Sequence, residues 1–519
     1  MRDYLQGETH LARFFEGSFD DPDSYLEKAR ELDGRFHRSG RERVAEMIRD
    51  PSEMARPGLE RFVEEGGYLV TTGQQPGLFL GPMYSLYKAL TAVRLAQALE
   101  PVVERPVLPL FWVGSEDHDW GEADHTHLLD RRNDLQTFRV PEQDGPPSRP
   151  LYRIPVESGL NETLDSFIET LPESDFSSSL FKSLRDAYPS GSTLSSGFVK
   201  VMEHLLGHLP ILFVEAHDPG LKKASQPVLF RELKEAETHE ALLHRTASHL
   251  EMEGYPPQVP ILEGGVNLFF EGPAGRDRLY RNGTDFRLNH AGTVLSREEL
   301  VERVHDDPSL LSPNVLLRPV VESALFPTLA YVAGPGELAY FAQLREFFRC
   351  HEIRMPIIFP RHSATLLEGK VEKVLDKFHL AVEGLSRPHH ELAGEIAREE
   401  LPSEIRQALG EIRGAVGKGA GVLARAAREV DPTLKGPVTH ARNTSFAAFD
   451  EAEKKILQAM KRQNEIALGQ LEKAQQNLFP LGRPQERVLN PNYYLARYGP
   501  ELIQELLEEF RVALGPDPA

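Results

Sequence analysis

Acidic and imidazole side chains crowd the segment that follows one apolar run. The pattern VLPLFWVG predicts a buried strand, and the stretch after it carries Glu116, Asp117, His118, Asp119, Glu122, Asp124, His125 and His127. An imidazole between carboxylates suits a general base, because negative neighbours raise its pKa and fix its ring. We predict that His118 is a catalytic base and that Asp117 or Asp119 orients it.

Two other interpretations of this SEDHD cluster stay open. Asp and His are acceptable metal ligands, although the stretch has no HExxH or other spaced ligand set. A metal there would make the protein a metal-dependent hydrolase of a small polar glycan or amide. Alternatively, the acidic residues form a solvated turn that caps a helix.

A glycine-rich corner, TTGQQPGLFLGPMYSLYKAL, forms the second candidate site. Gly73 removes a Cβ atom where a ligand could approach backbone amides. Gln74 and Gln75 stand at the tip of a predicted strand, and their amides both donate and accept, which suits a hydroxyl-rich or zwitterionic ligand. We predict that these three residues and Tyr84 bind substrate. The pattern is neither a Walker loop nor a dinucleotide fingerprint.

Lys88 lies about two turns into the helix that follows this corner. From there it could reach a phosphate or carboxylate, and we predict a catalytic role for it. A solvated surface lysine would show the same spacing.

A third strand tip, AGPGELAYF, again joins glycines to a helix start. Amides around Gly334 and Gly336 suit an anion, yet Glu337 in the first turn could satisfy the helix dipole itself. Arg318 and Arg361 supply the guanidinium forks that carboxylates and phosphates prefer. We assign all five residues to substrate binding.

Near the C-terminus, NPNYYLARYGP offers aromatic rings and one guanidinium. We predict that Asn492, Tyr493, Tyr494 and Arg497 bind a nucleotide, with plain packing as the alternative.

Composition limits the class of protein. The chain has 519 residues and a net charge of −20, which argues against binding to phosphate backbones. No apolar run is long enough for a membrane helix, and the N-terminal segment lacks the core of a secretory signal. The single Cys350 ends an amphipathic pattern and is interpreted as a packed thiol in a reducing compartment. We expect a cytoplasmic protein without nucleic-acid or membrane partners.

Strand and helix patterns alternate along residues 1–363. YLVTTG, VLPLFWVG, ILFVEAHD, LAYVAG and MPIIFPR read as buried strands with helices between them. This alternation predicts a doubly wound parallel α/β core, whose ligands gather at the carboxyl ends of the strands. Segments near 125–205 and 252–320 are richer in Pro, Gly and Ser and are interpreted as insertions.

Residues 364–479 differ in charge and periodicity. Arg361 to Lys473 holds 18 Lys+Arg against 17 Asp+Glu, a net of +1. Leu367 to Leu385 and Leu457 to Leu478 both step by 3 and 4, as heptad seams do. We predict that these two runs are the long helices of an antiparallel arm, with Asn464 fixing register, or that they pack along the core. The exposed side of such an arm suits a dimer. Residues 480–519 then return to the core.

Together, these motifs resemble the BshC family, the cysteine-adding enzymes of bacillithiol synthesis. The resemblance rests on TTGQQPGLFLGPMYSLYKA, LFWVGSEDHD, LSPNVLLRPVVESALFPTLAYVAGPGELAYF, MPIIFPR and NPNYYLARYGP, and it extends from near residue 60 to the C-terminus. Where the family leads us to expect a histidine before the helix lysine, this chain has Tyr87, which shifts weight to Lys88.

The resemblance implies a Rossmann-like, nucleotidyltransferase-like core with connecting insertions and a coiled-coil arm that serves a homodimer. It also implies a carbon–nitrogen ligase that joins the carboxyl of L-cysteine to the amine of glucosaminyl-malate, giving bacillithiol. ATP is expected by analogy with other ligases, because an amide forms in water only from an activated carboxyl. The enzymatic hypothesis requires the loops of Gln74, His118 and Gly334 to meet at one cavity.

Overall fold

The computed structural model describes residues 1–141 and 148–515, so part of the predicted insertion 125–205 lies outside the described residues. The chain divides into two compact units. The first comprises Met1–Arg131, Gln136–Ala364 and Glu486–Ala519, and the second comprises Arg132–Leu135 and Thr365–Gln485. None of the helices within the described ranges is both long and apolar enough to cross a membrane.

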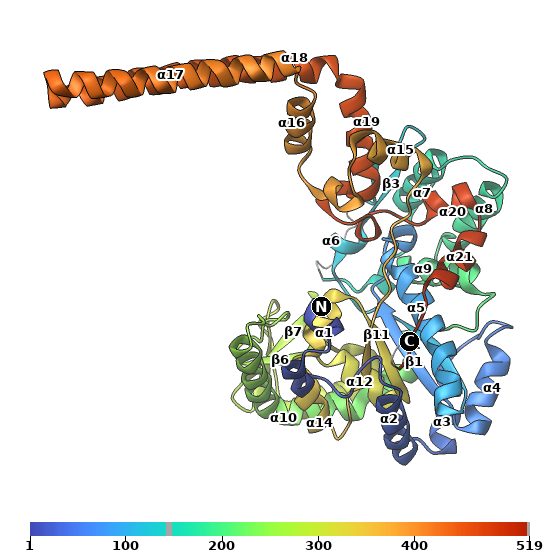
Figure 1. Ribbon diagram of the computed structural model, residues 1–519. Helices are drawn as coiled ribbons and strands as arrows, with labels where there is room; N and C mark the ends of the chain where they lie inside the picture. Colours follow the sequence, from blue (N-terminus) through green and yellow to red (C-terminus); the bar gives the residue numbers. More distant parts are fainter. Residues whose placement is uncertain (142–147, 516–519) are drawn as a thin grey trace. The chain divides into compact units, whose positions relative to one another are not determined.

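A five-stranded sheet forms the centre of the first unit (Figure 1). All its neighbouring strands pair in parallel. In spatial order they are β12 (Ile357–Pro360), β11 (Thr328–Ala333), β1 (Tyr68–Gln74), β2 (Val107–Val113) and β5 (Leu212–Glu215). The inner three strands are almost entirely buried, as expected when helices cover both faces. Each predicted strand is present, which confirms the parallel α/β core.

The order of these strands creates a switch point between β1 and β11. From β1 the chain proceeds outward through β2 to β5, whereas β11 and β12 extend the sheet in the opposite direction. In doubly wound sheets a ligand crevice forms outside the carboxyl ends of the strands at such a point. Gln74 and Gly334 stand at those two ends.

The longest helix next to β1 is α5 (Tyr84–Val103), which packs against β1 and β2. Its first two turns carry no charge apart from Lys88, and most of its residues are buried. The remaining helices before β2 are α1 (Arg2–Leu5), α2 (Pro22–Arg35), α3 (Arg38–Met47) and α4 (Arg56–Glu65).

The segments that we interpreted as insertions carry two further sheets. One is the pair β3 (His125–Leu129) and β4 (Leu135–Arg139). The other is antiparallel, in the order β10 (Leu311–Pro313), β6 (Gly265–Gly272), β7 (Gly275–Asn282), β8 (Asp285–Leu288) and β9 (Val294–Leu295). The helices between β2 and β11 are α6 (Trp120–Ala123), α7 (Ser158–Thr170), α8 (Ser177–Ala187), α9 (Leu194–Leu206), α10 (Pro219–Met252), α11 (Arg297–Asp306) and α12 (Arg318–Leu325).

The first unit ends with short helices after β11. They are α13 (Pro335–Phe341), α14 (Arg345–Cys350), α20 (Asn492–Tyr498) and α21 (Glu501–Glu509).

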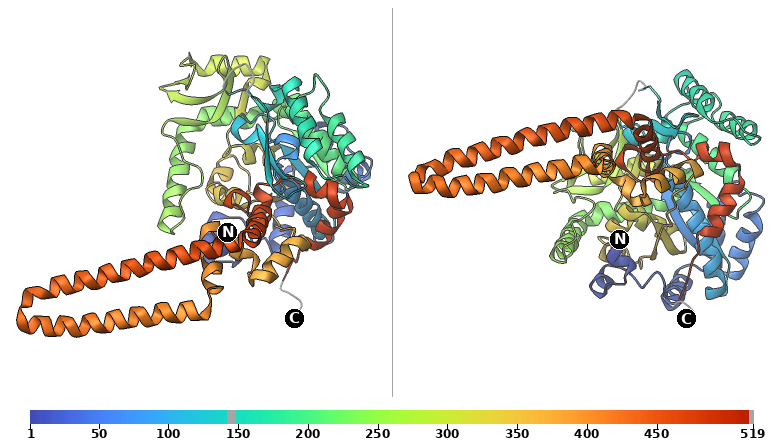
Figure 2. Two further views of the ribbon diagram at one scale, coloured as in Figure 1. Left: turned by 90° about the horizontal axis from the view of Figure 1, so that it is seen from above. Right: turned by 45° about the horizontal axis from the view of Figure 1, so that its top comes forward.

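The second unit is helical and contains a long antiparallel hairpin. Figure 2 shows α17 (Ser403–Val430) and α18 (Lys435–Gln463) side by side along their length. The other helices of this unit are α15 (Gly369–Phe378), α16 (His389–Glu399) and α19 (Glu465–Leu478). The antiparallel coiled-coil arm of the predicted fold is confirmed.

The prediction of which helices form the long pair was wrong. The heptad run Leu367–Leu385 ends its α-helix at Phe378, where His379 adopts φ 51°, and the hairpin uses α17 instead. The second run is interrupted at Asn464, which separates α18 from α19 and donates to a Glu400 carboxylate oxygen. The two seams contribute to one small core, built from residues such as Val371, Leu375 and Leu471. A heptad pattern therefore marked a packed core here rather than the projecting arm.

Candidate active site

A cavity of about 300 Å³ lies at the switch point. Residues from the ends of β1, β2 and β11 form its wall together with the start of α5 and parts of α12 and α13. The lining residues are Gly73, Gln74, Gln75, Tyr84, Lys88, Trp112, Gly114, Asp117, Glu122, Val315, Arg318, Tyr331, Gly334, Pro335, Gly336, Glu337, Tyr340, Arg361 and Arg487. All of the predicted substrate-binding residues, with Lys88 and Asp117, therefore meet at one place. His118 and Asp119 do not line the cavity.

The glycine-rich corner is a tightly packed structure. Phe79, Leu80 and Gly81 have φ values of 50°, 87° and 63°, and the two apolar side chains are buried. Asn490 Nδ2 and Asn492 Nδ2 donate to the Phe79 carbonyl at 2.8 and 2.9 Å. Consecutive left-handed residues leave backbone groups without regular partners, and these two amides satisfy one of them. The corner thus holds β1 and α5 at a fixed angle.

Asn492 is consequently committed to the fold. Its side chain is buried against Phe79, and Tyr493 and Tyr494 are also buried, with their rings edge to face at 4.9 Å. Arg497 Nη1 donates to the Tyr493 hydroxyl at 3.2 Å. None of these four residues lines the cavity. The geometry favours the packing alternative over the predicted nucleotide site, because no ring presents a free face for stacking.

Lys88 connects three elements. Its Nζ atom donates to Gly73 O at 2.6 Å and Gln74 Oε1 at 2.9 Å, and it pairs with Glu337 Oε2 at 2.7 Å. An ammonium has three N–H groups, so all of them are used. Burial lowers the pKa of Lys88, whereas the Glu337 carboxylate opposes that shift. Lys88 therefore acts as an internal cross-link between β1, α5 and α13, and the surface-lysine alternative is wrong.

Glu337 satisfies the start of α13. Its Oε2 atom accepts from Gly334 N at 2.8 Å, and its Oε1 atom accepts from the Tyr331 hydroxyl at 2.7 Å. Burial alone would raise the pKa of Glu337, but the Lys88 ammonium outweighs it and the pKa is lowered. The amide of Gly334, which we assigned to an anion, is already occupied by this carboxylate.

The two predicted arginine forks are also paired. Arg361 binds Glu486 through both terminal nitrogens at 2.9 and 2.6 Å. Arg318 donates to Glu322 Oε2 at 2.5 Å and to the Tyr331 and Tyr340 hydroxyls. Both arginines line the cavity, but their guanidinium groups already form ion pairs with protein carboxylates.

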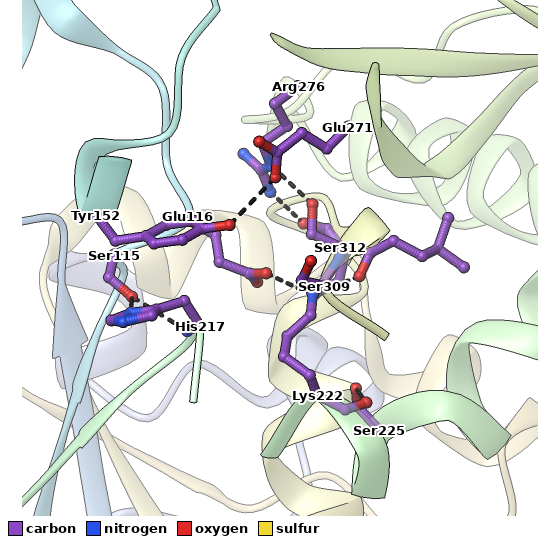
Figure 3. Close-up of polar contacts among 12 residues, drawn as sticks. Ser115, Glu116, Tyr152, His217, Lys222, Ser225, Glu271, Arg276, Ser309 and Ser312 are labelled. Carbon is purple, nitrogen blue, oxygen red and sulfur yellow. Dashed lines mark hydrogen bonds and ion pairs between the residues drawn. The ribbon is translucent and has the colours of Figure 1, made fainter. Parts of the chain in front are cut away.

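The SEDHD loop is held from several sides (Figure 3). Ser115 Oγ lies 2.9 Å from His217 Nδ1, and the Tyr152 ring stacks on His217 with centroids 4.4 Å apart. Glu116 pairs with Lys222, which also donates to the Leu311 carbonyl. These contacts, drawn in Figure 3, fix the loop against the segment that follows β5, and Lys222 joins it to the start of β10.

The structure places Arg276 beside His118, and the pKa of His118 is lowered rather than raised. Its Nη1 atom lies 3.2 Å from both Asp117 Oδ1 and His118 Nδ1. A guanidinium only donates, so Nδ1 accepts and the neutral ring carries its proton on Nε2. Burial, and next the positive charge of Arg276, lower the pKa of His118 to about 4. The prediction of a raised pKa was wrong, because burial of the ring and, next, the positive charge of Arg276 outweigh the neighbouring carboxylates.

Among the cavity residues that were not predicted as site residues, two are charged: Glu122 and Arg487. Glu122 faces the cavity. Burial of its carboxyl group and, next, the negative charges of Asp119 and Asp117 raise its pKa. Arg487 lines the cavity, and its guanidinium has no hydrogen bond or ion pair to any residue that the structure describes. Glu122 belongs to the acidic cluster that we noted, whereas no sequence pattern singled out Arg487.

The other interpretations of the SEDHD cluster lack support. Its charged members have separate partners: Lys222 for Glu116, Arg276 for Asp117, and His125 and Arg139 for Asp124. Within residues 1–141 and 148–515, no group of three potential metal ligands forms there. Asp119 is the N-cap of α6, but its side chain makes no capping hydrogen bond.

Comparison with known proteins identifies the family. The model described as "Bacillithiol biosynthesis BshC, N-terminal Rossmann-like domain" matches residues 1–362, and "Bacillithiol biosynthesis BshC, C-terminal coiled-coil domain" matches residues 364–514. The chain belongs to the BshC family. Both the Rossmann-like core and the helical arm are therefore family features, and the resemblance stated from the motifs is confirmed.

Other members of the BshC family align with most of this chain. Proteins named "Putative cysteine ligase BshC" are 32% identical over 478 residues in Salinibacter ruber and 34% identical over 463 residues in Prosthecochloris aestuarii. These alignments cover 91% and 86% of this chain and 87% and 82% of the relatives. A relative from Heliobacterium modesticaldum is 31% identical over 527 residues, which is 97% of this chain and 94% of its own length. The expected enzyme class, a carbon–nitrogen ligase, is confirmed by these names.

Proposed function

We propose that this protein joins L-cysteine to the amine of glucosaminyl-malate and so forms bacillithiol in the cytoplasm. The main support is that this BshC-family chain has a cavity at the switch point of its sheet. Residues from all three expected strand tips line that cavity. Its size and its polar, charged wall suit a small hydroxylated substrate with carboxylates.

Arg487 is the proposed anchor for a malate carboxylate. Arg361 is committed to Glu486, and Arg318 to Glu322, so a substrate would have to displace those carboxylates. Arg487 requires no such exchange, and a guanidinium can bind a carboxylate through two parallel hydrogen bonds. Gln74, Gln75 and Tyr84 lie on the same wall and offer groups for the sugar hydroxyls.

Glu122 is the proposed base, ahead of His118. Amide formation makes a bond between the amine nitrogen and the acyl carbon, breaks the bond from that carbon to its leaving group, and transfers a proton from nitrogen to a base. A carboxylate with a raised pKa is a stronger base than an ordinary one. Glu122 lines the cavity, whereas His118 Nδ1 is occupied by Arg276.

ATP belongs to this proposal as the source of carboxyl activation. The described residues do not form a phosphate cradle: Glu337 accepts from the Gly334 amide, and the corner after β1 is packed on itself. No step is therefore assigned to a nucleotide.

Product analysis tests the proposed function. Purified protein would be incubated with glucosaminyl-malate and L-cysteine, with and without ATP, and the products weighed by mass spectrometry. We expect a product equal in mass to both substrates less one water, dependent on ATP. If hydrolysed fragments of either substrate were the only products, the ligase proposal would be rejected.

We also propose a homodimer formed through the α17–α18 hairpin. Neither helix buries any residue within the described chain, and Val422, Leu423 and Val430 are 53%, 56% and 81% exposed. Exposed apolar side chains on a two-helix hairpin suit a surface that a second copy covers.

A further inference from the structure

Three buried side chains far from the cavity form a group that the ligase chemistry does not use. Glu232 and His239 lie on α10, and His351 follows the last residue of α14. The two helices pack side by side in the first unit (Figure 1). One potential ligand atom from each residue lies within 4.8 Å of the other two.

The tautomer of His239 is fixed by Glu232. His239 Nδ1 lies 2.6 Å from Glu232 Oε2, while Glu232 Oε1 accepts from Asn267 N and Asn267 Nδ2 at 3.0 and 2.9 Å. The carboxylate is an acceptor, so Nδ1 carries the proton and the lone pair is on Nε2. Metal-binding histidines are commonly oriented by a carboxylate in this manner.

The free ring nitrogens have no conventional partners. His239 Nε2 and both ring nitrogens of His351 are buried and make no hydrogen bond to the described residues. The two rings lie 4.9 Å apart, and the Phe347 ring meets each of them edge-on at 5.2 Å. Buried polar atoms without partners destabilise a fold, so these three nitrogens are candidates for binding a ligand.

A fourth, partly exposed side chain lies beside His239. Glu235 lies one turn before His239 on α10, and its Oε2 atom is 3.5 Å from His239 Nε2.

We propose that His239 and His351, with a carboxylate from α10, bind one divalent transition-metal ion of the Zn²⁺ type that joins α10 to α14. Imidazole nitrogen with carboxylate oxygen is a common ligand set for Zn²⁺. With bonds of about 2.0 Å, tetrahedral ligand atoms are about 3.3 Å apart, so the side chains close inward on binding. The site is structural, because none of its residues lines the cavity.

Metal titration of the full, tag-free chain tests this site. After removal of metal by chelation, Zn²⁺ would be titrated against a competing chromophoric chelator, and thermal unfolding would be followed in parallel. We expect one equivalent per chain and a higher Tm with Zn²⁺, because binding to the native state stabilises it. His239→Gln and His351→Gln should each weaken binding at least 100-fold. His244→Gln, on the same helix but exposed, is the matched control and should bind normally.

Two further measurements remove ambiguity. If His118→Gln abolishes binding while His351→Gln preserves it, the metal belongs to the SEDHD loop and the proposal is overturned. Should the His351 variant not fold, X-ray absorption of the Zn²⁺-loaded wild type decides: two imidazole ligands are expected, and an oxygen-only shell contradicts the site. Absence of stoichiometric binding by the wild type would show a packed histidine pair only.

Discussion

Individual side chains around the cavity divide into paired and available groups. Lys88, Glu337 and Arg361 have charged partners within the protein, so their charges shape the cavity wall. Glu122 and Arg487 face the same space without an ion-pair partner in the described part of the chain. A charged residue that lines the cavity is therefore not always available to a ligand, because its charge can already be paired within the protein.

Substitution of Glu122 separates the two candidates for the base. We expect Glu122→Gln to lower kcat by about 10²–10⁴-fold, the usual contribution of a general base. His118→Asn should change kcat by less than about tenfold, because Arg276 already occupies Nδ1. Single-turnover ligation assays at saturating substrates measure both. The reverse ranking of the two variants would restore His118 as the base.

Substitution of Arg487 tests the carboxylate anchor. Arg487→Gln should raise KM for glucosaminyl-malate by about 10–100-fold with little change in KM for cysteine, as expected for losing one charged hydrogen-bonded contact. Arg483→Gln is the control, because Arg483 is exposed and does not line the cavity. Steady-state kinetics with each substrate varied distinguishes these outcomes. An equal loss for both substrates would refute specific anchoring of the malate.

His118 also predicts a pH dependence of stability. Its folded pKa of about 4 lies below the ordinary 6.5, so the unfolded chain binds more protons between these values. This contribution to folding stability is present above about pH 6.5 and is lost as the pH falls from about 6.5 to about 4. Lowering the pH from about 7 to about 5 should destabilise the wild type by about 1–2 kcal/mol more than His118→Gln. Urea unfolding of both proteins at the two pH values measures this difference, and parallel losses would contradict it.

At the scale of elements, the site depends on how strand ends are joined. Lys88 on α5 reaches the end of β1 and the start of α13, while Arg276 on β7 reaches the loop after β2. The corner between β1 and α5 is closed by Asn490, just before α20, and by Asn492, the first residue of α20. These contacts place the strand ends around one cavity before any substrate binds.

Removal of the Lys88 cross-link should be costly. Lys88→Met leaves Glu337 buried without its cation, and we expect a loss of about 3–5 kcal/mol in the free energy of unfolding. The double variant Lys88→Met/Glu337→Gln should recover part of this loss because no unpaired charge remains. Urea denaturation of the wild type, both single variants and the double variant completes the cycle. Strictly additive losses would show that the two side chains do not interact.

At the scale of the whole molecule, the chain combines a catalytic unit with a helical unit. The cavity is lined entirely by residues of the first unit. The second unit contains its own apolar core and the exposed α17–α18 hairpin. Such a division is consistent with chemistry in one unit and assembly in the other.

Charges on the hairpin test its role in assembly. Val422→Asp/Leu423→Asp should convert a dimer to a monomer, because two carboxylates would be desolvated at an apolar interface. Ala408→Asp, at an exposed position near the start of α17, is the control and should remain dimeric. Light scattering after size-exclusion chromatography measures the masses. A dimer that survives the double substitution would place the interface elsewhere.

The sequence by itself determined the family, the parallel α/β core and the strand tips that carry the site. Apolar runs and glycine turns are local signals, and Gln74, Lys88 and Gly334 could be found from them because parallel strands bring their carboxyl ends to one edge. An antiparallel helical arm was also predicted, but the heptad runs used to place it lie mostly in the packed core of the second unit.

Only the tertiary structure decided which polar groups are available. Partners such as Arg276 for His118 and Glu486 for Arg361 are separated by more than a hundred residues, and no local pattern predicts such pairs. The same holds for His239 and His351, which meet because α10 packs on α14. Electrostatic energies depend on distance and burial, and both are set by packing rather than by neighbours in sequence.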